Sequence, residues 1–187
     1  MNITLYGAAS EKIDRFYIDE VEELGREMAR RGHAMVFGAG SGGLMGAAAR
    51  GLSQEGGTII GITPHFMHSV EPIYDQCTRL IHTDTLSERK DIMEKMADAF
   101  VIVPGGIGTF DEFFQILTLK KLGRHNKPIV LFNVRNFWDN LLGVIGSDIF
   151  KGFIGCDVAE CISVSETPKT VVDLVERLVT EAAAKTR

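Results

Sequence analysis

The chain has 187 residues, of which 45% are hydrophobic, and its formal net charge is −5. This length is enough to bury one sizeable core. The acidic balance argues against non-specific nucleic-acid binding, which depends on a basic face, and no apolar run approaches the roughly 18 residues of a membrane-spanning helix. We therefore expect a cytoplasmic globular protein that binds neither nucleic acid nor membranes.

Short apolar runs alternate with helical patterns along the whole chain. Most of the runs are continuously apolar, which is typical of parallel strands buried on both faces. The predicted strands cover residues 3–6, 34–37, 58–62, 79–82, 99–103, 128–132 and 161–164. The predicted helices cover 14–31, a segment ending near 54, 86–96, a segment ending near 123, a segment beginning at 137, and 168–184. Residues 63–77 remain an irregular connection, of a length that often forms a binding loop.

This alternation predicts a single domain over residues 1–187 with an α/β fold. We expect a doubly wound, Rossmann-like parallel sheet with helices on both faces, since crossovers between parallel strands are right-handed. Ligands of such folds bind beyond the carboxyl ends of the strands. A barrel of alternating strands and helices is the less suitable alternative, because it typically needs about 250 residues.

The cysteines and histidines give no metal signature. Cys77, Cys156 and Cys161 are odd in number and lack C-x-x-C spacing, which indicates reduced thiols in an intracellular protein. His65 and His68 lie three residues apart, but no further ligand stands nearby in the sequence. We expect neither a metal nor a cofactor.

The strongest functional pattern follows the predicted strand at 99–103. It reads Pro104-Gly105-Gly106-Ile107-Gly108-Thr109 and opens onto a helix. Glycines let a backbone approach a phosphate closely, and the free N–H groups and dipole of a helix N-terminus favour an anion. No Lys-Ser/Thr pair of a nucleoside-triphosphate loop follows. The sequence therefore predicts that residues 105–109 bind a monophosphate.

A second glycine loop follows the predicted strand at 34–37. Gly38-Ala39-Gly40-Ser41-Gly42-Gly43 formally matches a dinucleotide fingerprint, but no acidic residue follows the next strand to bind a ribose hydroxyl. We interpret Gly40, Ser41 and Gly42 as a further phosphate or nucleotide cradle. The alternative is a turn that serves only close packing of a helix on the sheet.

Glu112 allows two interpretations. Thr109-x-x-Glu112 matches a capping box, in which the glutamate side chain returns to the start of its own helix. A carboxylate beside a bound phosphate is, however, unfavourable unless cations offset it or it has a task of its own. Arg89 and Lys90 are candidate cations, although such a helical charge run is usually a solvated face. We favour the functional interpretation of Glu112.

Three segments carry a resemblance to a known family. They are Glu88-Arg89-Lys90-x-x-Met93, the Pro-Gly-Gly-x-Gly-Thr-x-x-Glu motif at 104–112, and Leu122-Gly123-x-His125-x-Lys127-Pro128. Together they resemble the Lonely Guy (LOG) family of cytokinin riboside 5′-monophosphate phosphoribohydrolases, long mislabelled as possible lysine decarboxylases. The similarity runs from the first strand to the last helix. Departures include Gly7-Ala8-Ala9-Ser10, where relatives often have Gly-Ser-Ser.

The resemblance implies hydrolysis of the N-glycosidic bond of a nucleoside 5′-monophosphate, giving free base and ribose 5-phosphate, by a homodimer. Transferred by position, it implies that Arg89 and Glu112 are the catalytic pair. It also implies a set of nucleotide contacts, to which we add Ser10 of the first small-residue loop. The expected binding residues are Ser10, Gly40, Ser41, Gly42, Glu71, Lys90, Gly105, Gly106, Ile107, Gly108, Thr109 and Thr118.

Two other functions compete with hydrolysis. A carrier for molybdenum cofactor, or a nucleotide sensor, would resemble this chain in the Pro-Gly-Gly-x-Gly-Thr loop without doing chemistry. The Glu-Arg-Lys segment together with Glu112 favours the enzyme. An amino-acid decarboxylase is the weakest alternative, because it would need a lysine that forms a Schiff base with pyridoxal phosphate.

Overall fold

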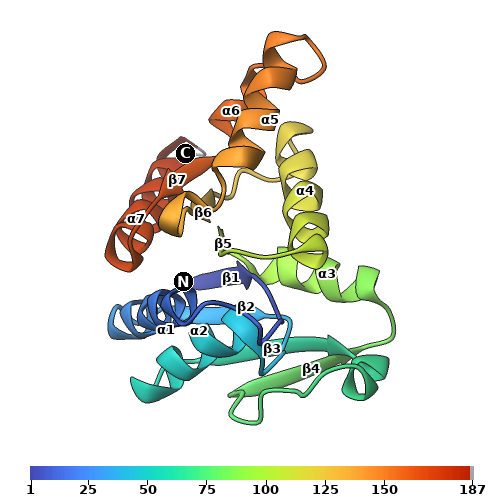
Figure 1. Ribbon diagram of the computed structural model, residues 1–187, viewed down its shortest axis with the longest axis vertical. Helices are drawn as coiled ribbons and strands as arrows, with labels where there is room; N and C mark the ends of the chain where they lie inside the picture. Colours follow the sequence, from blue (N-terminus) through green and yellow to red (C-terminus); the bar gives the residue numbers. More distant parts are fainter. Residues whose placement is uncertain (186–187) are drawn as a thin grey trace.

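The computed structural model describes residues 1–185 and contains a seven-stranded sheet whose paired strands are all parallel (Figure 1). The strand order is β4-β3-β2-β1-β5-β6-β7, so the direction of winding reverses between β1 and β5. Such a switch point is where ligands of doubly wound folds bind. The strands are β1 (Asn2–Tyr6), β2 (Ala34–Phe37), β3 (Ile59–Pro64), β4 (Arg79–Thr83), β5 (Ala99–Ile102), β6 (Ile129–Phe132) and β7 (Ser163–Ser165).

The helices cover both faces of this sheet, which confirms the predicted doubly wound α/β fold. Helices α1, α2 and α7 pack on one face, and α3, α4, α5 and α6 pack on the other (Figure 1). The helices are α1 (Arg15–Arg30), α2 (Gly43–Gln54), η1 (His65–Ser69), α3 (Leu86–Met96), α4 (Ile107–Lys121), η2 (Val134–Asn136), α5 (Asp139–Phe150), α6 (Asp157–Glu160) and α7 (Pro168–Lys185).

Strand β5 shows why the predicted strands read as continuous apolar runs. Ala99 and Val101 enter the core under α1, α2 and α7, whereas Phe100 and Ile102 enter the core under α3 and α4. Successive side chains of a strand point to opposite faces, so a strand covered on both faces needs apolar residues throughout. Each fully buried valine, isoleucine or phenylalanine side chain of such a strand contributes about 1.5–3 kcal/mol to the stability of the fold.

Helices α1 and α2 pack with their backbones in contact. A methyl group at Gly25 of α1 would lie 2.2 Å from the carbonyl oxygen of Ala48. A methyl group at Gly51 of α2 would lie 2.0 Å from the carbonyl oxygen of Glu22. The two glycines thus permit a reciprocal close approach that any other residue would prevent.

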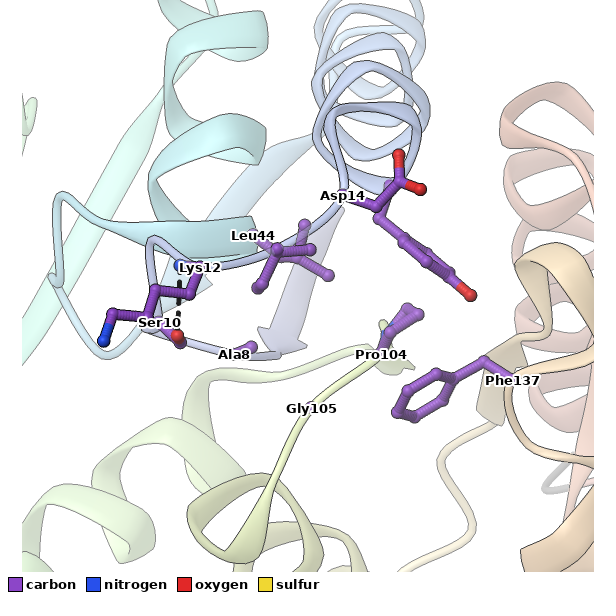
Figure 2. A pocket seen from close by; sticks show the side chains of 10 residues that line it. Ala8, Ser10, Lys12, Asp14, Leu44, Pro104, Gly105 and Phe137 are labelled. Carbon is purple, nitrogen blue, oxygen red and sulfur yellow. Dashed lines mark hydrogen bonds between the residues drawn. The ribbon is translucent and has the colours of Figure 1, made fainter.

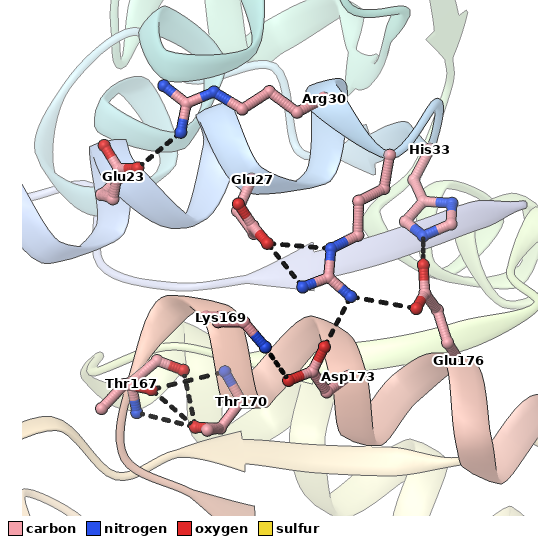
Figure 3. Close-up of polar contacts among 10 residues, drawn as sticks. Glu23, Glu27, Arg30, His33, Thr167, Lys169, Thr170, Asp173 and Glu176 are labelled. Carbon is pink, nitrogen blue, oxygen red and sulfur yellow. Dashed lines mark hydrogen bonds and ion pairs between the residues drawn. The ribbon is translucent and has the colours of Figure 1, made fainter.

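An ion-pair network ties the end of α1 to α7 (Figure 3). The Arg31 guanidinium donates to Glu27, which precedes it on α1, and to Asp173 and Glu176 of α7 at 2.7 and 3.0 Å. The imidazole Nε2 of His33 lies 2.8 Å from the other carboxylate oxygen of Glu176. Networks of this kind outweigh isolated surface pairs, and this one helps to hold the last helix against the body of the protein.

The observed elements depart from the predicted ones mainly in short segments. The last strand is Ser163–Ser165 instead of 161–164, because Cys161 is taken up as the C-cap of α6. The connection 63–77 is less irregular than expected, since it contains η1 and an antiparallel bridge between Gly40 and Ile73. Single helical turns such as η1, η2 and α6 carry too few residues for a periodic signal. Within residues 1–185, no helix has the length and apolar character needed to cross a bilayer.

Candidate functional site

A cavity of about 280 Å³ lies at the carboxyl edge of the sheet, at the switch point. The loop after β1 forms one wall and the first turns of α4 form another, with side chains from α2, α3 and the 63–77 connection between them. The lining residues are Gly7, Ala8, Ala9, Ser10, Met45, Glu71, Arg89, Gly106, Gly108, Thr109 and Glu112. Of the predicted site residues, this cavity brings together Ser10, Glu71, Arg89, Gly106, Gly108, Thr109 and Glu112.

A buried ion pair joins the two predicted catalytic residues. The Glu112 carboxylate Oε1 accepts a hydrogen bond from Arg89 Nη2, and the two side chains are only 8% and 13% exposed. The helix begins at Ile107 with Gly106 as N-cap and without a side-chain cap. Thr109 therefore lies inside the helix and Glu112 does not return to its start. The capping-box interpretation is wrong, because the helix begins before Thr109 and the Glu112 carboxylate accepts a hydrogen bond from Arg89 instead.

Burial and charge set the protonation of this pair. Burial raises the pKa of Glu112 to about 7, and the Arg89 guanidinium only partly opposes this rise. Burial also raises the pKa of Glu71, again against the influence of Arg89. The second cation of the segment, Lys90, lies 2.8 Å from Asp111. Both carboxylates at the start of α4 thus have a cationic partner from α3, as the charge conflict at this helix end required.

Arg89 owes its position to the second glycine loop. A methyl group at Gly38 would lie 2.6 Å from Arg89 Nη2, so the guanidinium packs directly on the backbone there. In the part of the chain that the structure describes, the buried Arg89 Nε has no hydrogen-bond partner. The first glycine of that loop therefore makes room for a site residue, a role that its spacing did not indicate.

Helix α4 differs from α1, α2 and α3, which also begin at this edge of the sheet. Side chains cap α1 and α3, because Asp14 accepts from Phe16 N–H and Thr85 accepts from Glu88 N–H. At the start of α2, the Ala8 carbonyl accepts from Leu44 and Met45 at 2.8 and 3.3 Å. Within residues 1–185, the first three N–H groups of α4 (107–109) have no acceptor. Free N–H groups at a helix N-terminus attract an anion.

The glycines of this helix start have different reasons to be glycine. A methyl group at Gly105 would lie 2.0 Å from the Thr109 hydroxyl oxygen, so the fold itself requires Gly105. A methyl group at Gly106 or Gly108 would meet nothing within 4 Å. Their lack of a side chain therefore leaves open space at the cavity wall, where a ligand can approach the backbone.

The second glycine loop faces the protein more than the cavity. The backbone N–H and the hydroxyl of Ser41 both donate to the Pro72 carbonyl, at 3.0 and 3.1 Å. A methyl group at Gly42 would lie 2.8 Å from the Ala9 carbonyl oxygen, and one at Gly40 would lie 3.3 Å from the Glu71 carboxylate. The structure places Gly40 behind Glu71, and it does not bring Ser41 or Gly42 to the cavity lining.

The remaining predicted site residues also lie outside the cavity lining. Thr118 and Ile107 line a separate groove of about 580 Å³ on the outer face of α4. Lys90 is next to the site but is paired with Asp111, and Gly105 forms the wall of a neighbouring cavity. Prediction from the sequence missed Gly7, Met45 and the backbone of Ala8 and Ala9. The small residues after β1 were the available signal for that wall.

The structure brings a third histidine to the pair at 65 and 68. The rings of His65 and His82 stack at 4.9 Å, and His68 Nε2 lies 3.4 Å from His82 Nδ1. Across residues 1–185, no group of three or more histidine, cysteine or acidic side chains is arranged to hold a metal ion.

Comparison with known proteins decides the family. A family model described as "Possible lysine decarboxylase" matches residues 45–175. The cytokinin riboside 5′-monophosphate phosphoribohydrolase LOG of Oryza sativa subsp. japonica is 34% identical over 179 residues, covering 96% of this chain and 74% of that protein. The cytokinin riboside 5′-monophosphate phosphoribohydrolase of Rhodococcoides fascians is 35% identical over 154 residues, covering 82% and 78%. The chain belongs to the LOG family.

Solved structures with the same fold extend beyond proteins named as LOG hydrolases. The molybdenum cofactor carrier protein of Chlamydomonas reinhardtii superimposes with a TM-score of 0.73 at 24% identity, covering 96% of this chain and 98% of that one. A molybdenum cofactor binding protein of Rippkaea orientalis gives a TM-score of 0.70 at 20% identity, covering 95% of each chain. These likenesses show the fold that the LOG family shares with such proteins.

Proposed function

We propose that this protein hydrolyses the N-glycosidic bond of nucleoside 5′-monophosphates, of the adenine or cytokinin type, to free base and ribose 5-phosphate. The observation that carries the proposal is the joint placement of an open helix N-terminus and a buried Glu112–Arg89 pair in one cavity. The relatives named as phosphoribohydrolases support the same reaction.

The helix N-terminus and Glu112 are spaced to contact the 5′-phosphate and the ribose of one nucleotide. The free N–H groups of residues 107–109 would hold the 5′-phosphate, whose binding positions the reacting bond. Glu112 lies about one helical turn further on, roughly 5.4 Å along the axis, and helical side chains tilt back toward the N-terminus. The carboxylate would therefore face the ribose that the phosphate carries.

The chemistry needs a carboxylate at that point. Breaking the bond between C1′ and the base leaves positive charge on the ribose, as in glycoside hydrolysis. Glu112 would stabilise this charge and take a proton from the attacking water, for which a pKa of about 7 is well suited. Arg89 stays protonated at any relevant pH, and we assign it to orienting Glu112 and the substrate.

The test is base release from AMP and isopentenyl-AMP by the wild type and by Glu112→Gln. We expect the variant to lose about 10²–10⁴-fold in turnover, since it keeps the shape of the side chain but cannot carry charge or accept a proton. Circular dichroism establishes that the variant is folded. Near-normal turnover of a folded Glu112→Gln protein would refute the assignment.

The same assay separates the competing functions. A carrier for molybdenum cofactor or a nucleotide sensor would bind its ligand and release no base from the wild type. A pyridoxal-dependent decarboxylase would need a lysine at the site, whereas the lysine nearest the pair, Lys90, is bound to Asp111. A wild-type protein that hydrolyses neither nucleotide would favour the carrier.

We also propose that the protein forms a homodimer through the outer face of α4. Apolar side chains are exposed there and on the neighbouring α5 segment, including Phe114 at 42% and Phe150 at 92%. Helix α5 and the turn after it project from the body of the protein (Figure 1). Thr118 would then lie in the interface, which explains its distance from the cavity of its own chain.

A further inference from the structure

A second cavity, of about 320 Å³, lies on the other side of the loop after β1 (Figure 2). Ala8 and Ser10 line both cavities, so this loop is a common wall. The second cavity continues between the start of α1, Pro104-Gly105 and Phe137. It lies at the same switch point as the Glu112 cavity, and the proposed reaction makes no use of it.

The walls of this cavity are aromatic and apolar. The rings of Tyr17 and Phe137 meet at 6.2 Å with an interplanar angle of 77°. Leu44 and the Pro104 ring complete the apolar lining, and Phe137 and Pro104 lie side by side in Figure 2. A corner of two aromatic rings favours a flat ligand ring, which can stack on one ring and meet the edge of the other.

Few polar groups line the cavity, and the Tyr17 hydroxyl is available to a ligand. Asp14 is already engaged, since it caps α1 and pairs with Arg135 at 3.3 Å. The Lys12 ammonium points away from the aromatic corner (Figure 2), and in the described part of the chain the Tyr17 hydroxyl has no hydrogen-bond partner. A mainly apolar cavity with a few free polar groups is the usual form of a small-molecule site.

The backbone that presents Phe137 adopts an uncommon conformation. Arg135 and Asn136 have φ values of +50° and +58°, a region that residues other than glycine seldom occupy. The surrounding contacts enforce it: Arg135 stacks over the Phe16 ring at 3.7 Å, and the Asn133 side chain accepts from Trp138 N–H at 2.7 Å. Strained residues of this kind tend to occur where a structure clamps a ligand.

We propose that this second cavity binds a small planar heterocycle, such as a free purine base. The aromatic corner recognises the flat ring, and the Tyr17 hydroxyl bonds to a nitrogen or oxygen atom at its edge. A phosphate is the wrong ligand here, because the free N–H groups of α4 face the other cavity. Binding at this site does not require the proposed hydrolysis, so either proposal can fail without the other.

The single tryptophan of the chain offers a direct readout. Trp138 packs edge-to-face on Phe137 with ring centroids 4.9 Å apart, whereas neither residue lines the Glu112 cavity. Adenine is titrated into the Glu112→Gln variant and Trp138 emission is followed, with equilibrium dialysis of labelled adenine as a second measurement. We expect saturable binding that persists when AMP is present at saturating concentration, and no response to ribose 5-phosphate.

Matched variants locate the bound adenine. Phe137→Leu keeps apolar volume but removes the ring, and should weaken adenine binding by roughly two- to tenfold in the dialysis measurement. Phe66→Leu is the control, because Phe66 is similarly exposed (47% against 38%) but lies on η1. If Phe137→Leu is unfolded by circular dichroism, Tyr17→Phe takes its place, because it removes the hydroxyl that bonds to the ring edge. Loss of adenine binding when AMP is added, equal affinity of the folded variants, or no binding at millimolar adenine would overturn the proposal.

Discussion

Glu112 is held between two opposing effects, a burial that disfavours its charge and an arginine that favours it. Burial prevails, and the pKa rises from 4.5 to about 7. Because the folded protein then keeps a proton that the unfolded chain has lost, this group contributes stability below about pH 4.5 that is lost as the pH rises through about 7. The ionised carboxylate that the proposed reaction needs is therefore the less stable form of the fold.

The pH dependence of base release should follow this titration. We expect kcat/KM for AMP to rise with pH, to reach half its maximum near pH 7, and to level off above it. Arg89→Met removes the charge that lowers the Glu112 pKa, so the half-maximum should move to higher pH. Stopped assays between pH 5.5 and 9 measure both profiles. A flat wild-type profile, or an unmoved midpoint in the variant, would contradict a base with this environment.

The glycine at position 108 separates binding from folding. Alanine there meets no protein atom within 4 Å and suits a helix better than glycine by about 1 kcal/mol. We expect Gly108→Ala to keep or raise the unfolding free energy, yet to raise KM for AMP at least about tenfold because the methyl group occupies the ligand's approach. Gly146→Ala, also in a helix and in open space, is the control and should leave KM unchanged.

The sequence predicted which side chains lie together better than it predicted the shape of the cavity. The pairing of Arg89 with Glu112 agrees with what the family motif implies. The capping-box interpretation placed the start of α4 too late. Thr109 has the residue type of an N-cap, but the helix already begins at Ile107, with Gly106 as its N-cap. The place of Thr118 could not be predicted, since it depends on which face of α4 is turned outward.

At the scale of elements, the contact between α1 and α2 depends on two positions. Gly25 and Gly51 each lie against a carbonyl oxygen of the other helix. Helix propensity alone would favour alanine at both, so their identity reflects the packing of the two helices. The sequence predicted α1 from its apolar spacing and α2 from its alanine content, and it did not predict this backbone contact.

Replacing glycine by alanine should have opposite effects on stability at Gly25 in α1 and at Gly143 in α5. Gly25→Ala forces α1 and α2 apart and should lower the free energy of unfolding by about 1–3 kcal/mol, as in other overpacked cores. Gly143→Ala in α5 meets open space and should raise it by about 0.5–1 kcal/mol. Urea unfolding of both variants measures the difference. If both variants changed the free energy of unfolding equally, α1 and α2 would not be in the close backbone contact described above.

At the scale of the whole molecule, the order of the strands in the sheet could not be predicted from the sequence. Apolar runs identify strands, but which strands become neighbours depends on the face that each crossover helix covers. The order found here places the loops after β1 and β5 next to each other, and the Ala8 N–H donates to the Pro104 carbonyl at 3.1 Å. Both cavities result from that neighbourhood.

The apolar outer face of α4 makes a prediction about the assembly. We expect the wild type to sediment at about twice its 20.6 kDa chain mass and Phe114→Asp to move toward the monomer, because a charge would be buried in the interface. Phe66→Asp, which is similarly exposed at 47% on η1, should leave the mass unchanged. Analytical ultracentrifugation distinguishes the outcomes, and a monomeric wild type would rule out the proposed dimer.

The helices that begin at this edge of the sheet differ in how many of their first N–H groups already have an acceptor, which affects how anions can bind there. In α1, α2 and α3, some of the first-turn N–H groups are engaged by Asp14, the Ala8 carbonyl or Thr85. Among the four helices α1–α4, and within the described residues 1–185, α4 alone has no acceptor for any of its first three N–H groups. If α4 holds the phosphate as proposed, the starts of α1, α2 and α3 offer fewer donors to a second phosphate, so a dinucleotide would gain less from it. Discrimination against dinucleotides would then need no steric gate, because the chain's own groups already take up part of the other donors.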